Sequence, residues 1–217
     1  GRSSKNAKKN RYKKILPTEK SRIILSKHET SDSDYINANL IPGMLFGLKQ
    51  SYIATQAPTQ ETFEDFWRMI YEYNCRIIIM LTETDDENID ESLSCLYKGK
   101  AKRYWPLLGK TETYGSIKVR TITQHQYTDS EIVYQEFLIT SSQNITRKIY
   151  FLQYIGWPDM GTPESSLPLR KMMWMLNDLL EKMSSFEVGP IVLHCSAGKI
   201  LFLPFYCFCY IYTLIPL

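Results

Sequence analysis

The chain has 217 residues, of which 44% are hydrophobic and 23% are charged, so a folded core is expected and a fully disordered chain is excluded. At roughly 150 residues per domain, this length favours one domain built around one core. The net charge of +3 is unevenly spread, because residues 1–14 carry seven basic side chains and no acidic one, which argues against a nucleic-acid-binding surface on the rest of the chain.

The basic segment comes first in the chain. Residues 1–10 are basic and polar, and we expect them to form a mobile lead-in, with ordered structure beginning near Tyr12. The folded domain is then expected over residues 11–199, followed by an apolar tail over residues 200–217.

A helix is expected between Pro58 and Asn74, because apolar side chains recur there at the spacing of one helix face. These side chains are Phe63, Phe66, Trp67, Ile70 and Tyr71. The short β-branched run at residues 77–81 then predicts a strand that is covered on both faces.

The acidic stretch from Asp85 to Glu91 is expected to be a loop. It lacks the glycine and the regular oxygen spacing of a calcium loop, so we predict no metal site there. Three segments rich in Ile, Val, Tyr, Phe and Thr follow, at residues 115–123, 131–139 and 147–155, and predict antiparallel strands.

A second helix is expected from Ser166 to Met183, since leucines and methionines recur on one face, where they fill a core. The strand Pro190–Leu193 comes next and ends in His194 and Cys195. Strands of both kinds with helices between them predict an α/β or α+β fold with a central mixed sheet.

Five cysteines at irregular spacings, with no signal peptide at the start of the sequence, predict a reducing, cytoplasmic setting. The glycosylation sequon at Asn144 is accordingly interpreted as a polar turn between strands.

Chemistry is first indicated by Cys195, which directly follows a buried strand and precedes Ser196, Ala197 and Gly198. Backbone N–H groups of such small residues can turn inward and form a nest that binds an anion such as phosphate. A nest of this kind also lowers the pKa of a thiol, and His194 could orient or hydrogen-bond the sulfur. A buried structural cysteine is the alternative for this segment taken alone.

Seven short segments, read in their order along the chain, favour the catalytic interpretation of Cys195 over the structural one. They are Lys9-Asn10-Arg11-Tyr12, Asp34-Tyr35-Ile36-Asn37-Ala38-Asn39, Tyr52-Ile53-Ala54-Thr55-Gln56-Ala57-Pro58, Asp65-Phe66-Trp67, Tyr104-Trp105-Pro106, Trp157-Pro158-Asp159 and His194-Cys195-Ser196-Ala197-Gly198. Over residues 9–198 the sequence thereby resembles the classical protein tyrosine phosphatases.

The resemblance implies hydrolysis of phosphotyrosine in proteins or peptides through a phosphocysteine on Cys195, without metal or cofactor. Asp159 would be the general acid, carried on a mobile loop with the tryptophan and proline before it. Tyr12 would pack on the phenol ring of the substrate and set the depth of the cleft. Ser196, Ala197 and Gly198 would bind the phosphate group of the substrate.

One departure from the family pattern bears on activity. The family places an arginine six residues after the cysteine, followed by Ser or Thr, but this chain has Leu201 and Phe202 there. The bidentate contact of a guanidinium with phosphate has no apolar substitute, and Lys199 stands two residues too early. We therefore expect turnover to be very low or absent.

The tail from Ile200 to Leu217 carries no charge and is a borderline membrane-span candidate, which Pro204, Pro216 and its many Tyr and Cys residues weaken. We expect instead that it replaces family sequence through alternative splicing, intron read-through or a frameshift just after Gly198, which leaves an incomplete domain. The alternatives to an impaired enzyme are a non-catalytic phosphotyrosine-binding protein and an unstable splice product.

Overall fold

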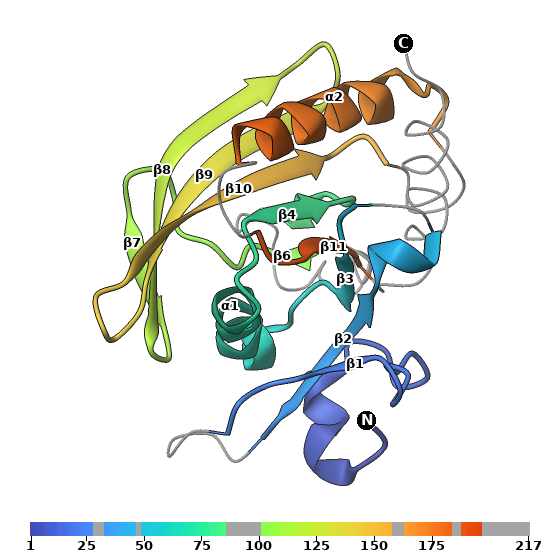
Figure 1. Cartoon of the computed structure of the whole chain (residues 1–217), viewed down its shortest axis with the longest axis vertical. Helices are drawn as coiled ribbons and strands as arrows, with labels where there is room; N and C mark the ends of the chain where they lie inside the picture. The colour runs from blue at the N-terminus through green and yellow to red at the C-terminus, as the bar shows by residue number, and fades with distance from the viewer. Residues whose placement is uncertain (28–32, 47–48, 86–100, 158–162, 184–187, 197–217) are drawn as a thin grey trace.

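The computed structural model describes residues 1–27, 33–46, 49–85, 101–157, 163–183 and 188–196. Its main feature is a twisted sheet of nine strands in the order β1-β2-β3-β11-β4-β10-β9-β8-β7 (Figure 1). The strands are β1 (Arg22–Ile24), β2 (Tyr35–Ile41), β3 (Tyr52–Gln56), β4 (Ile77–Met80), β7 (Thr111–Tyr114), β8 (Ile117–Tyr127), β9 (Ile132–Thr140), β10 (Thr146–Tyr154) and β11 (Ile191–Cys195). A separate pair is formed by β5 (Thr84–Asp85) and β6 (Ala101–Lys102).

The sheet is mixed, as the sequence predicts. Its four central strands, β3, β11, β4 and β10, run parallel, whereas the strands on both flanks pair antiparallel. Every residue of β3, β4 and β11 is buried, which explains why two of these strands are continuous apolar runs in the sequence.

The three predicted antiparallel strands are confirmed as β8, β9 and β10. In β8 the polar residues Gln124, His125 and Gln126 continue the strand beyond its predicted end at residue 123. Their side chains are exposed, and backbone pairing with β9 as far as Tyr127 keeps them in the sheet.

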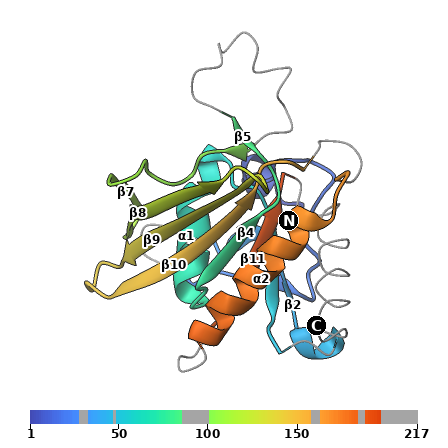
Figure 2. The same cartoon turned by 90° about the horizontal axis from the view of Figure 1, so that it is seen from above.

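Both predicted helices are present. The 3-10 turn η3 (Gln60–Thr62) leads into α1 (Phe63–Glu72), and the capping box between Thr59 and Thr62 satisfies backbone donors at its start. Helix α2 spans Leu167–Lys182 and buries the predicted stripe, with Pro168 in its first turn. The two helices cover opposite faces of the sheet (Figure 2).

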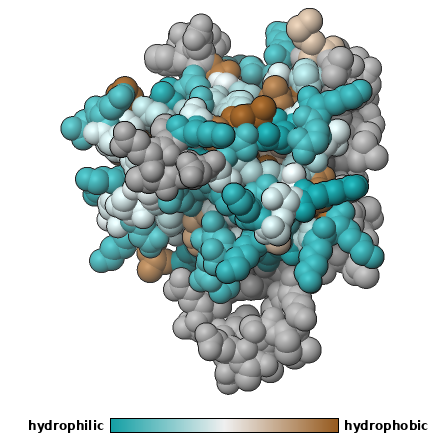
Figure 3. Space-filling model, turned by 90° about the horizontal axis from the view of Figure 1, so that it is seen from below, coloured by the Kyte–Doolittle hydropathy of each residue, from teal (hydrophilic) through white to brown (hydrophobic). Residues whose placement is uncertain are grey.

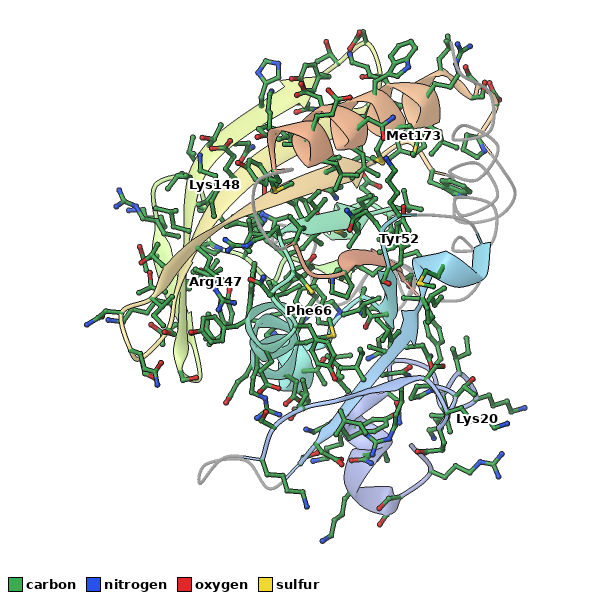
Figure 4. The ribbon with its side chains drawn as sticks, in the orientation of Figure 1. Lys20, Tyr52, Phe66, Arg147, Lys148 and Met173 are labelled. Carbon is green, nitrogen blue, oxygen red and sulfur yellow. The ribbon has the colours of Figure 1, made fainter. Side chains whose placement is uncertain are left out.

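Each face of the sheet therefore carries its own hydrophobic core. The core on the α1 side includes Phe66, Trp67 and Tyr104, and the core on the α2 side includes Met173, Trp157 and Cys195. Figure 4 labels Phe66 on α1 and Met173 on α2, which lie on either side of the central strands.

Regular structure begins before Tyr12, earlier than the sequence predicts. Residues Ser4–Lys9 form the 3-10 helix η1, which the Asn10 side chain closes by donating to the Asn6 carbonyl at 2.9 Å. Lys9 Nζ lies 2.7 Å from Asp65 Oδ2 on α1, so the basic segment is tied to the domain by one of its own charges. Composition alone does not reveal that partner.

The described residues on one face of the molecule are mostly polar. Figure 3 shows hydrophilic side chains over most of the face seen from below, with apolar ones in small groups. A third 3-10 element, η2, covers Gly43–Phe46. Among the helices of the described residues, none has the length and apolar character needed to cross a membrane.

Candidate active site

The candidate nucleophile lies where three parallel strands end together. Cys195 is the last residue of β11 and pairs with Gln56, the last residue of β3. On the other side of β11, the Leu81 N–H donates to the His194 carbonyl at 2.9 Å. The carboxyl ends of neighbouring parallel strands are where open α/β sheets bind ligands, so the position of Cys195 fits a binding site.

Cys195 and His194 point to opposite faces of the sheet, because side chains alternate along a strand. Cys195 is 5% exposed and belongs to the core on the α2 side. The His194 ring packs on the α1 side, with its centroid 5.9 Å from that of Phe66. The imidazole and the thiol are therefore separated by the strand that carries both.

His194 has other partners than the sulfur. Its Nε2 lies 2.7 Å from the Tyr104 hydroxyl, and its Nδ1 lies 3.4 Å from the Cys195 carbonyl oxygen. Burial lowers its pKa to about 4, so the ring is neutral at pH 7. This arrangement suits a residue that orients the backbone at Cys195, while a direct role for His194 in catalysis stays a prediction.

Tyr12 lies next to the residue that follows the cysteine. Its hydroxyl group is 2.9 Å from the Ser196 hydroxyl group, across 184 positions of sequence. The Ser196 carbonyl also accepts from the Ala57 N–H at 3.2 Å, which holds the chain after β11 against the end of β3. Three of the predicted site residues, Tyr12, Cys195 and Ser196, are thereby brought together.

The acid loop is only partly described. Trp157 is 7% exposed and shares the α2-side core with Cys195, with its ring centroid 6.3 Å from that of Tyr154. Trp157, two positions before Asp159, is therefore anchored in the same core as the thiol.

The rest of the predicted site lies outside the described residues. This applies to Asp159, to Ala197 and Gly198 of the phosphate loop, and to Leu201 with the tail at residues 200–217. Asp85, where the predicted acidic loop begins, is instead the last residue of β5, while the rest of that stretch, residues 86–91, falls outside and stays a prediction.

For two residues of this site, Tyr104 and Gln56, the sequence predicts no role. Tyr104 is fully buried, and burial raises the pKa of its phenol, so its hydroxyl group remains protonated beside His194. Gln56 is 5% exposed and ends a strand of otherwise apolar and small residues. A long polar side chain at the end of a fully buried strand is the signal that identifies it, since such an amide needs partners.

The sequence is similar to those of several known proteins. The family model described as protein-tyrosine phosphatase matches residues 6–200. The chain is 40% identical over 200 residues to tyrosine-protein phosphatase non-receptor type 12 of Homo sapiens, covering 91% of this chain and 23% of that protein. It is 36% identical over 196 residues to receptor-type tyrosine-protein phosphatase C of Homo sapiens, covering 89% of this chain and 14% of that protein.

A third relative is matched over a larger share of its length. This is tyrosine-protein phosphatase non-receptor type 7 of Rattus norvegicus, with 37% identity over 196 residues, covering 89% of this chain and 49% of that protein. The chain thus spans less than half the length of each of these three relatives. The match extends through the candidate nucleophile, and the chain belongs to the classical protein tyrosine phosphatase family.

Proposed function

We propose that the site hydrolyses phosphotyrosine in proteins or peptides, with Cys195 as the nucleophile. The sulfur attacks phosphorus and forms an S–P bond while the bond from phosphorus to the phenolic oxygen breaks. Asp159 gives its proton to the departing oxygen. Water then attacks the phosphocysteine, the S–P bond breaks, and inorganic phosphate leaves.

The observation that carries this proposal is the contact between Tyr12 and Ser196 beside Cys195. It joins the first and last motifs of the family at the ends of parallel strands. An aromatic ring at that place can pack against the phenol ring of a phosphotyrosine whose phosphate reaches toward Cys195. The shorter side chains of phosphoserine and phosphothreonine would not reach as far.

The proposed activity is low, because Leu201 stands where the family has an arginine. An arginine that clamps a transferred phosphoryl group is worth on the order of a thousand- to a hundred-thousandfold in rate, about 4 to 7 kcal/mol of barrier. A leucine donates no hydrogen bond to phosphate and carries no charge, so this stabilisation is lost.

The setting that we infer is the cytoplasm, because a cysteine nucleophile needs a reducing environment. Cys75 and Cys195, the two cysteines in the described part of the chain, are both free thiols. The partners that we propose are proteins that carry phosphotyrosine, in keeping with the names of the relatives.

Turnover of a phosphotyrosine peptide tests the proposal. The catalytic domain of the human type 12 relative, assayed in parallel, supplies the reference rate. We expect kcat/KM to be at least a thousandfold below that reference, and the residual activity to vanish in Cys195→Ser. A rate within tenfold of the reference would contradict the role given to Leu201, and residual activity that survives in Cys195→Ser would contradict the role of the cysteine.

A further inference from the structure

Gln56 occupies a place between the nucleophile strand and the segment that carries Tyr12. It is the last residue of β3 and pairs in register with Cys195 on β11. Gln56 is 5% exposed, so its amide group lies away from water and requires hydrogen-bond partners within the protein.

Both ends of that amide are used, and both contact the backbone just before Tyr12. Nε2 donates to the Lys9 carbonyl at 2.8 Å, and Oε1 accepts from the Arg11 N–H at 3.0 Å. A side-chain amide has one donor end and one acceptor end, so it bridges residues 9 and 11 much as a neighbouring strand would. The spacing of one residue between the two partners fits this geometry.

The intervening residue is held from another strand. Asn10 Oδ1 accepts from the Tyr35 hydroxyl group at 2.6 Å and from Asn37 Nδ2 at 3.0 Å, both on β2. Asn37 Nδ2 also donates to the Ile15 carbonyl at 2.8 Å, on the far side of Tyr12. The β2 contacts therefore fix the segment laterally, whereas the Gln56 contacts fix it to the strand adjacent to the nucleophile.

We propose that Gln56 is a positioning residue that sets the height of the Tyr12 ring above the site of Cys195 and Ser196. Tyr12 follows Arg11 directly, and its hydroxyl group meets Ser196 at 2.9 Å. Loss of the amide releases the backbone at both Lys9 and Arg11, so the Tyr12 ring moves relative to the end of β11. The recognition part of this proposal rests on the proposed phosphotyrosine function, while the placement of Tyr12 does not.

The proposal predicts different changes in affinity for a phosphotyrosine peptide and for inorganic phosphate. A phosphotyrosine peptide contacts the Tyr12 ring as well as the phosphate loop, so its affinity depends on where that ring lies. Under the proposed function, inorganic phosphate contacts only the residues around Cys195 and Ser196. Releasing Tyr12 therefore weakens peptide binding and leaves phosphate binding unchanged, whereas general damage to the fold weakens both.

The first measurement is amide hydrogen exchange at Arg11, whose N–H is the donor to Gln56. Gln56→Met keeps the length of the side chain and removes both hydrogen bonds, so exchange at Arg11 should rise at least tenfold. Gln56→Glu keeps an acceptor oxygen for Arg11 and should retain most of the protection. The matched control is Gln60→Met, because Gln60 lies exposed in η3 and should leave Arg11 unaffected.

The second measurement is an NMR titration of the same variants with the phosphotyrosine peptide and with inorganic phosphate. We expect Gln56→Met to weaken peptide binding at least fivefold, with phosphate affinity within twofold of the unsubstituted chain and no change in Gln60→Met. Unchanged exchange at Arg11, or equal weakening of both probes, would overturn the proposal. If the unsubstituted chain binds neither probe, the recognition part fails together with the proposed function, while faster exchange at Arg11 in Gln56→Met would still support the placement of Tyr12.

Discussion

At the scale of single residues, His194 makes the stability of the fold depend on pH. Its pKa is lowered from 6.5 to about 4, chiefly because burial removes the water that would stabilise the imidazolium. The unfolded chain therefore takes up this proton near pH 6.5, and the folded protein takes it up only near pH 4. The stability that depends on His194 is complete above pH 6.5, and about 3 kcal/mol of it is lost as the pH falls through this interval.

Substitution of His194 tests this directly. The free energy of unfolding of the unsubstituted chain, measured by urea titration between pH 7 and pH 4.5, should fall more steeply than that of His194→Gln. The difference isolates the histidine from the carboxylates that titrate in the same range. Parallel curves for the two proteins would show that His194 is not the cause.

The hydrogen bond between Tyr104 and His194 should also be measurable. Tyr104→Phe removes one hydroxyl group and leaves Nε2 of a buried ring without its partner, which should cost about 1–3 kcal/mol of unfolding free energy. Tyr127→Phe is the matched control, because the Tyr127 hydroxyl group has no hydrogen bond within the described residues. Equal stabilities of the two variants would contradict the account.

Some residues of this site can be predicted from the sequence and others cannot. Cys195 and Ser196 follow from a buried strand that ends in small residues, and Tyr12 follows from the motif that contains it. Tyr104 and Gln56 are assigned no role, since their partners lie 90 and 45–47 positions away in the sequence. Such contacts depend on how the strands are ordered in the sheet, which periodicity does not give.

At the scale of elements, the entry into β11 requires a glycine. A Cβ atom on Gly189 would lie 2.0 Å from the Tyr73 carbonyl oxygen and 2.7 Å from that of Asn74, both of which are backbone atoms at the end of α1. The Gly189 N–H donates to the Asn74 carbonyl at 3.1 Å, so the two segments are held in close contact.

Gly189→Ala should therefore destabilise the protein by about 1–3 kcal/mol, because the backbone must separate to admit the methyl group. Thermal unfolding of this variant and the unsubstituted chain would measure the change. Hydrogen exchange should rise along β11, which begins two residues after Gly189. An unchanged melting temperature would mean that the turn adapts without cost.

Helix α1 carries Asp65, which forms an ion pair with Lys9 of the amino-terminal segment. Asp65 lies 2.7 Å from Lys9 Nζ and 3.2 Å from Arg68 Nη2, and its side chain is 7% exposed. Asp65→Asn keeps the shape of the side chain and removes its negative charge. The positive charge of the largely buried Arg68 is then only partly neutralised. We expect a loss of about 2–3 kcal/mol and faster exchange in η1. A loss below about 0.5 kcal/mol, measured by urea unfolding, would exclude this anchoring role.

Elements with strong periodicity are the ones that the sequence predicts well. The stripe from Phe63 to Tyr71 marks α1, and the β-branched run at residues 77–81 marks β4. In contrast, β2 shows no alternation, because Asn37 is buried and satisfied by Asn10 and the Ile15 carbonyl. Helix η1 has no apolar stripe, and its order comes from the charge of Asp65 and the amide of Gln56.

At the scale of the whole molecule, the fold places two cores on the two faces of one sheet, and β11 belongs to both. His194 points into the core with α1, and Cys195 points into the core with α2. The mixed sheet and the helices follow from the sequence, but the insertion of β11 between β3 and β4 does not. Because of this insertion, the end of β11 at Cys195 lies beside the end of β3 at Gln56.

Alkylation of Cys195 tests most directly whether this junction is a phosphotyrosine site, because it needs no turnover. Iodoacetamide labelling, followed by peptide mass mapping, gives the rate at Cys195, and the fully buried Cys75 serves as the internal control. We predict that a phosphotyrosine peptide slows labelling of Cys195 at least threefold, whereas the same peptide without phosphate leaves the rate unchanged. Equal rates with both peptides, or a Cys195 that is never labelled, would contradict the account.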